Sequence, residues 1–120
     1  MSRDFRLYLD DMFTAAEKVL EFTRGYSRDR FVEDAKTCAV VRNLEIIGEA
    51  TKNIPTEIRD RHADVEWRKI AGLRDIVAHQ YFGIDEDIVW DIVQHQIPGL
   101  LDQIRRIIAI EDDPTLRRSP

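Results

Sequence analysis

The sequence contains few of the residues that interrupt regular structure or build special sites. Among 120 residues there are five glycines, four prolines and one cysteine. Because Cys38 has no partner for an intramolecular disulfide, we expect it to be a small core or boundary residue in a reducing cytoplasm. No apolar run approaches membrane-spanning length, and the first residues already follow a charged amphipathic pattern. We therefore expect neither a signal peptide nor a transmembrane segment.

Several enzyme signatures are also missing. The chain has no P-loop, dinucleotide-binding fingerprint, zinc-ligand spacing or serine-nucleophile motif, and it has no internal repeat. These absences set the corresponding enzyme classes aside. The net charge is −5 at pH 7, so the chain as a whole does not attract nucleic acid, and any contact with RNA must be local.

The residues that are present favour helices. A chain with 43% hydrophobic and 34% charged residues suits one soluble domain with one core. Apolar residues recur at steps of three and four rather than in alternation, which predicts an all-α fold. We expect residues 1–110 to form the helical domain. Residues 111–120 have almost no apolar content, which predicts a flexible C-terminal tail.

Glycine and proline mark the expected ends of the helices. The first helix begins near Ser2, a possible N-cap, and stops near Gly25. A second long helix ends at Pro55, and a third spans residues 67–81. Pro98 either kinks the following helix or begins a further one.

Small residues inside two of these helices predict close packing. Gly48 and Ala50 in the second helix indicate a point where another helix crosses. Gly72 lies inside the third helix at a cost of about 1 kcal/mol relative to alanine, which suggests close backbone approach there as well.

The stretch from Arg74 to Tyr81 gathers a fixed cation, a carboxylate, an imidazole and a phenol. In a helix, Asp75 and His79 are i,i+4 neighbours, and Arg74 and Tyr81 lie about 20° apart on one face. The carboxylate can fix the tautomer of the imidazole and favour its protonated form, as a proton-transferring histidine requires. The forked guanidinium suits a phosphate. An exposed ion pair and a snorkelling arginine explain the same spacing without any catalysis.

Two carboxylates of the second helix extend this set. Glu45 and Glu49 are one helical turn apart. Three interpretations fit this spacing: two carboxylates that face water, an acid/base pair, or half of a metal site. Arg74 falls in line with the apolar residues of its helix, so a contact with a helix or a subunit is favoured over full solvation. A further possibility is that Glu49 supports Arg74 across the helix pair, because a partly buried cation needs a counter-ion. The predicted apolar line comprises Trp67, Ile70, Ala71, Arg74, Val77, Ala78 and Tyr81.

A cluster of basic residues precedes the third helix. Arg59, Arg61 and His62 are typical of a solvated surface. Together with Arg68 and Lys69 they alternatively form a local basic patch that an RNA backbone could use.

The pattern Arg74-x4-His79-x-Tyr81 resembles the R-x4-H-x-Y signature of the HEPN superfamily and, more narrowly, of its HepT branch, also catalogued as DUF86. Asp75 stands where asparagine is expected, but the family pattern accepts several polar residues there. The likeness extends, in the family's order, to residues 42–50, 67–74 and 83–93.

This resemblance implies an antiparallel helical bundle of four to five helices that forms a homodimer and cuts RNA without a metal or another cofactor. It implies that His79 is the acid or base, that Arg74 stabilises the phosphate and the transition state, and that Asp75 orients the site. RNA carries its own nucleophile in the 2′-hydroxyl, so these groups suffice.

The resemblance also implies a type VII toxin–antitoxin pair. Its partner would be a cognate MntA-like nucleotidyltransferase antitoxin that adds AMP to Tyr81, where a bulky anion would block the site and repel RNA. An amphipathic aromatic at the edge of the core explains Tyr81 equally well. A non-catalytic HEPN module that binds a nucleotide or a partner is the alternative function.

The spacing of five between Arg74 and His79 bears on assembly. On a regular helix it sets the two residues about 140° apart, so one helix cannot aim both at one phosphate unless it bends or unwinds between them. A two-fold dimer brings the arginine of one chain near the histidine of the other. We therefore expect a homodimer whose two motifs face a shared cleft, with Gly72 at the seam.

Overall fold

Every regular element in the described parts of the chain is an α-helix, as the apolar spacing predicts. The structure is a computed structural model, and it describes residues 4–33, 37–79 and 86–113. Eight helices form within these ranges, and several of them are short. They are α1 (Phe5–Phe22), α2 (Arg28–Glu33), α3 (Thr37–Lys52), α4 (Thr56–Arg61), α5 (Trp67–Ala71), α6 (Leu73–His79), α7 (Glu86–His95) and α8 (Ile97–Asp112).

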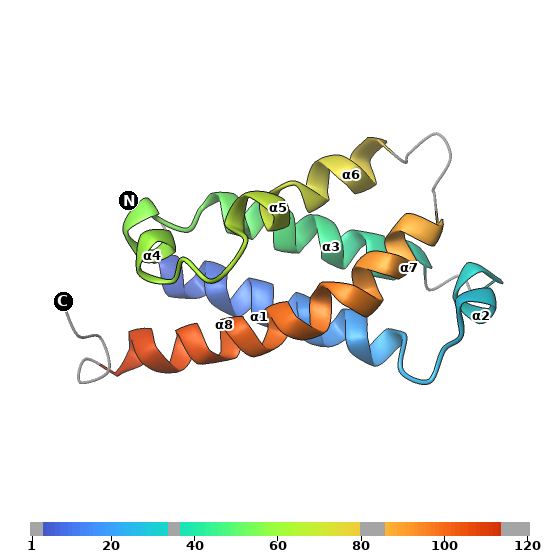
Figure 1. The fold of residues 1–120 in the computed structure, drawn as a ribbon, viewed down its shortest axis with the longest axis horizontal. Coiled ribbons are helices and arrows are strands. Elements are labelled where there is room, and N and C mark those ends of the chain that lie inside the picture. The colour runs from blue at the N-terminus through green and yellow to red at the C-terminus, as the bar shows by residue number, and fades with distance from the viewer. Residues whose placement is uncertain (1–3, 34–36, 80–85, 114–120) are drawn as a thin grey trace.

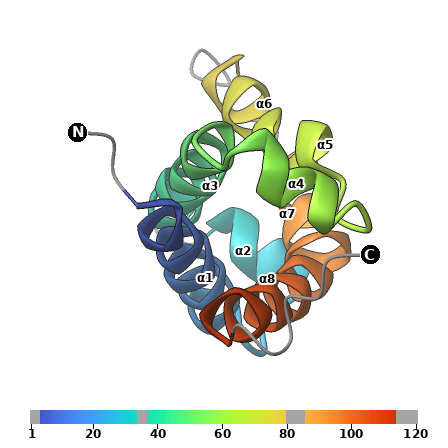
Figure 2. The ribbon, with the colours of Figure 1, turned by 90° about the vertical axis from the view of Figure 1, so that its left-hand side faces the viewer.

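The long helices form an antiparallel bundle. α1 runs in one direction, α3 returns beside it, α5 and α6 run forward again, and α7 and α8 come back (Figure 1). α1 packs against α3 and α8, and α3 packs against α5 and α6. In the end-on view of Figure 2, α6 lies outside the ring of helices, beyond α3. The predicted all-α bundle is confirmed. Its five main segments are α1, α3, α5 with α6, α7 and α8, while the short α2 and α4 lie in the connections.

The ends of the helices follow local capping chemistry. Asp4 is the N-cap of α1, and its side chain accepts a hydrogen bond from the backbone nitrogen of Arg6 at 2.9 Å. The predicted cap, Ser2, lies outside the described residues. Gly25 follows α1 with a φ of 74°, a left-handed conformation that glycine adopts without strain. Pro98 lies in the first turn of α8, so it begins a new helix rather than kinking α7.

α3 and α6 cross at Gly48, as predicted. A Cβ added to Gly48 would lie 2.8 Å from the backbone nitrogen of Arg74 and 3.2 Å from the carbonyl oxygen of Ala71. No real side chain tolerates such contacts, so only glycine lets the two backbones approach this closely.

The close approach predicted at Gly72 is wrong within the described chain. A Cβ added there would meet the carbonyl oxygens of Arg68 and Lys69, each at the ordinary contact distance of 3.4 Å and each from the preceding turn. Gly72 instead caps the C-terminus of α5 and separates it from α6.

α8 runs past residue 110, where the sequence places the boundary between the helical domain and the tail. α8 continues to Asp112, and Glu111 is fully buried, so the division at residues 110 and 111 falls inside a helix. The Glu111 carboxylate contacts Arg61 and His62 there. The remainder of the predicted tail, residues 114–120, lies outside the described residues.

A helix that crosses a membrane must be long and apolar. None of the helices in the described ranges combines the length and the apolar character that crossing a membrane requires.

Candidate functional site

α6 divides its residues between the core and solvent. Leu73 and Val77 are one helical turn apart and are buried against the bundle. Arg74, Asp75 and Ile76 lie between them in sequence and are exposed. The predicted apolar line is therefore wrong at Arg74, because Leu73 takes the buried place and Arg74 is exposed.

Arg74 makes an ion pair with Glu49 of α3. Nη1 of the arginine lies 3.0 Å from Oε2 of the glutamate, and the two side chains are 51% and 55% exposed. This is the contact that the sequence left open as a possibility. Among the described residues, the other guanidinium nitrogens have no hydrogen-bond partner, so they remain available to an anionic ligand.

A hollow of about 250 Å³ surrounds this ion pair. It lies between α3 and α6 and combines two cations, two carboxylates and one apolar side chain. Its lining residues are Arg42, Glu45, Ile46, Glu49 and Arg74. The formal charges of these residues cancel. Any attraction for a phosphate therefore comes from the Arg74 side chain itself and not from the hollow as a whole.

The other predicted site residues are described in part. The backbone of His79 ends α6, which is helical from Leu73 through Arg74 to His79. The side chain of His79 lies outside the described part of the structure. Asp75 is exposed beside Arg74. Tyr81 lies outside the described residues, so its position relative to Arg74 remains a prediction.

The basic patch predicted before the third helix is wrong for His62, which is buried, and its neighbour Arg61 contacts the same buried carboxylate. Nη1 of Arg61 lies 2.6 Å from Oε1 of Glu111, and Nε2 of His62 lies 2.7 Å from Oε2 of the same carboxylate. His62 is buried, whereas Arg61 stays exposed and also places Nη2 3.1 Å from Oε1 of the exposed Glu57. The nitrogen of His62 donates in its contact with Glu111, because a carboxylate only accepts.

This cluster has a clear electrostatic consequence. Burial raises the pKa of the Glu111 carboxyl, but the hydrogen bonds from His62 and Arg61, together with the charge of Arg61, outweigh burial and hold the pKa below its ordinary value. Glu111 therefore stays ionised inside the bundle and links α8 to α4.

The sequence contains a signal for this cluster. Ile104, Ile107 and Glu111 follow one another at helical spacing, so the carboxylate continues the apolar face of its helix. A carboxylate on such a face requires hydrogen-bond donors, which Arg61 and His62 supply.

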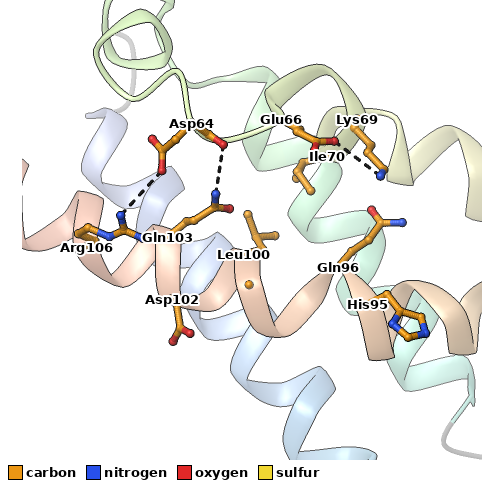
Figure 3. Close-up of a pocket in the computed structure, with 11 residues that line it drawn as sticks. Asp64, Glu66, Lys69, Ile70, His95, Gln96, Leu100, Asp102, Gln103 and Arg106 are labelled. Carbon is orange, nitrogen blue, oxygen red and sulfur yellow. Dashed lines mark hydrogen bonds and ion pairs between the residues drawn. The ribbon is translucent and has the colours of Figure 1, made fainter.

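A larger hollow of about 430 Å³ lies between the start of α5 and the junction of α7 with α8 (Figure 3). Its cations already have acidic neighbours, since Lys69 Nζ lies 3.6 Å from a Glu66 oxygen and Arg106 Nη1 lies 3.9 Å from an Asp64 oxygen. His95, at one end of the hollow, is exposed, as its polar neighbours in the sequence predict. This arrangement gathers no excess of positive charge for a phosphate.

A metal ion needs several histidine, cysteine or carboxylate ligands in one place. Within the described residues, no three or more histidine, cysteine, aspartate or glutamate side chains form a group that could hold a metal ion. Glu45 and Glu49 therefore do not belong to such a group.

The chain is similar to known proteins over most of its length. The profile of the family described as HepT-like, "Ribonuclease HepT-like", matches residues 12–107. A protein of Caldanaerobacter subterraneus subsp. tengcongensis, named "Putative RNase TTE0752", is 43% identical over 107 residues, which cover 88% of this chain and 96% of that protein.

Archaeal proteins give a similar result. "Probable ribonuclease HepT" of Thermococcus cleftensis is 42% identical over 108 residues, covering 89% of this chain and 98% of that protein. "Putative RNase MJ0127" of Methanocaldococcus jannaschii is 40% identical over 107 residues, covering 88% of each chain. No solved structure matches the chain significantly.

Proposed function

The chain belongs to the HepT-like ribonuclease family, and we propose that it is a metal-independent endoribonuclease that cuts RNA in the cytoplasm. Relatives named as ribonucleases support RNA as the substrate class. The observation that carries the proposal is the half-exposed Arg74, which is anchored through one nitrogen and borders a hollow.

The proposed chemistry needs one cation and one proton carrier. The 2′-oxygen of the RNA attacks the adjacent phosphorus while the 5′-oxygen leaves, which yields a 2′,3′-cyclic phosphate and a 5′-hydroxyl. His79 accepts the proton of the 2′-hydroxyl or supplies one to the leaving oxygen. Arg74 stabilises the additional negative charge on the phosphate oxygens, and its fork can bind two of them at once. Asp75 orients the site.

The proposed active form is a homodimer with composite sites. On a regular helix the spacing of five between Arg74 and His79 corresponds to about 140°, so a single α6 would not aim both at one phosphate. In a two-fold dimer, the arginine of one chain and the histidine of the other can face one phosphate. Ile76 is exposed on the flank of α6 opposite Arg74, and it gives the helix an apolar side chain that a subunit contact would bury.

The proposed regulation is a type VII toxin–antitoxin pair. A cognate nucleotidyltransferase antitoxin would add AMP to the hydroxyl of Tyr81, two residues beyond His79 in the sequence. The added phosphate would repel the RNA backbone, and the nucleoside would occupy the space that RNA needs.

Cleavage of RNA by the purified chain tests the proposal. We expect wild type to produce 2′,3′-cyclic phosphate ends in the presence of EDTA and His79→Ala to produce none. Circular dichroism and thermal melting should be unchanged in the variant. Equal cleavage by both chains would overturn the assignment, and an inert wild type that binds a nucleotide or a protein partner would instead indicate a non-catalytic module.

A further inference from the structure

Two adjacent residues of α3, Gly48 and Glu49, contact the backbone and the guanidinium of Arg74 in α6. Gly48 lies under the backbone of Arg74, where an added Cβ would stand 2.9 Å from the arginine Cβ. Glu49 reaches the far end of the same side chain, with Oε2 3.0 Å from Nη1. A single turn of α3 therefore determines both the position of the Arg74 backbone and the position of its guanidinium.

The ion pair is better placed to orient a cation than to stabilise the fold. Both side chains are about half exposed, and ion pairs in water contribute little to stability because solvent screens them. An arginine without a partner samples many rotamers, each with the guanidinium in a different place. The Glu49 carboxylate restricts this choice before any substrate arrives.

We propose that Glu49 is a positioning residue for Arg74 in RNA cleavage, a role that rests on the ribonuclease function proposed above. The carboxylate binds Nη1, and the remaining N–H groups of the guanidinium meet the phosphate. Glu49 touches neither the RNA nor the reacting atoms. It acts through Arg74 alone, because preorganised donors stabilise a transition state without the cost of reorienting during the reaction.

The chain provides a matched control one turn earlier on the same helix. Glu45 lines the same hollow, carries the same charge and has no ion pair with Arg74 in the described structure. Glu45→Gln and Glu49→Gln therefore change the charge of the hollow equally. Only the second removes the carboxylate that contacts Arg74.

Steady-state cleavage of an RNA substrate compares the two variants. We expect Glu49→Gln to lower kcat by about 10- to 100-fold with little change in KM, because a misplaced catalytic group affects the chemical step. Glu45→Gln should retain kcat within about twofold, since the orientation of Arg74 is intact. Equal losses in both variants, or a gain of activity in Glu49→Gln, would overturn the proposal.

A double-mutant cycle separates positioning from a general effect on folding. In an Arg74→Ala background, Glu49→Gln should cause no additional loss of the residual activity, because its route to the reaction is already gone. Guanidinium ion, added below the concentration that unfolds the chain, should partly restore Arg74→Ala only when Glu49 is present to bind it. Additive losses, or equal rescue with and without Glu49, would refute the role.

One measurement distinguishes failure of this proposal from failure of the ribonuclease assignment. The Nε–H resonance of Arg74, assigned by its disappearance in Arg74→Lys, should shift in Glu49→Gln and stay in place in Glu45→Gln. An inert wild type with this pattern would overturn the ribonuclease assignment while Glu49 still restrains Arg74. An active wild type whose resonance ignores Glu49 would overturn the positioning role alone.

Discussion

Gly48 of α3 lies directly against Arg74 of α6, so that a methyl group added to the glycine would stand 2.8 Å from the arginine's backbone nitrogen. We expect Gly48→Ala to destabilise the protein by about 1–3 kcal/mol, because the added carbon meets backbone that cannot rotate away. The better helix propensity of alanine offsets only about 1 kcal/mol of this cost. RNA cleavage should decrease as well, because a shift of the Arg74 backbone displaces its side chain. Urea unfolding and RNA cleavage provide the two measurements.

Gly99 in α8 provides the control for that substitution. A Cβ added to Gly99 would meet nothing within 4 Å. Gly99→Ala should therefore leave stability unchanged or raise it by up to about 1 kcal/mol, as expected for alanine in an unobstructed helical position. If Gly48→Ala matched Gly99→Ala in stability, the close crossing of α3 and α6 would be wrong.

Glu111 should make the free energy of unfolding depend on pH. Its folded pKa lies below the ordinary value, so its contribution is present above the unfolded pKa of about 4.3 and is lost as the pH falls through the folded pKa. Glu111→Gln removes the charge that faces Arg61 and His62 and should cost about 3 kcal/mol at neutral pH. Denaturant unfolding from pH 7 to pH 3 should show the difference from wild type shrinking below about pH 4.3.

Asp112 is the matched control on the same helix. Its side chain lies 3.3 Å from Arg6 but is 56% exposed, so Asp112→Asn should cost no more than about 1 kcal/mol. A loss as large as that of Glu111→Gln, or a Glu111→Gln difference that persists unchanged to pH 3, would contradict the role given to the buried carboxylate.

Helical spacing predicts the elements of this fold well, and its error at Arg74 of α6 has a simple origin. Between Ile70 and Val77, steps of three then four select Leu73, whereas steps of four then three select Arg74. Both choices satisfy the period of the helix. Burial of leucine is favourable and burial of a guanidinium is costly, so the structure takes Leu73.

The two parts of the candidate site differ in how far the sequence predicts them. The need of Arg74 for a counter-ion is a local property, and it correctly indicates Glu49 as a partner. The partnership of Glu111 with His62 joins residues 49 positions apart, and it depends on how α4 meets the end of α8. Helical periodicity alone predicts which face of a helix is buried, but it does not predict which other helix packs against that face.

Modification of Tyr81 is a prediction for the intact protein and its partner. Incubation with a cognate nucleotidyltransferase and ATP should add one or more AMP units to this residue and stop RNA cleavage, because the added phosphate repels the substrate. Intact-mass and peptide mass spectrometry measure the product, and Tyr81→Phe should accept nothing. Efficient modification of Tyr81→Phe would show that the site lies elsewhere.

Composite sites predict complementation between inactive chains. Co-expression of Arg74→Ala and His79→Ala chains with different affinity tags allows purification of the mixed dimer. If each site takes Arg74 from one chain and His79 from the other, one site of the mixed dimer is intact and should restore about half of the wild-type activity. If both residues act from the same chain, the mixed dimer stays inactive, as each variant does alone. Sedimentation of wild type should give a dimer at micromolar concentration, and a monomer that still cuts RNA would exclude shared sites, because a single continuous α6 would then have to present both residues to one phosphate.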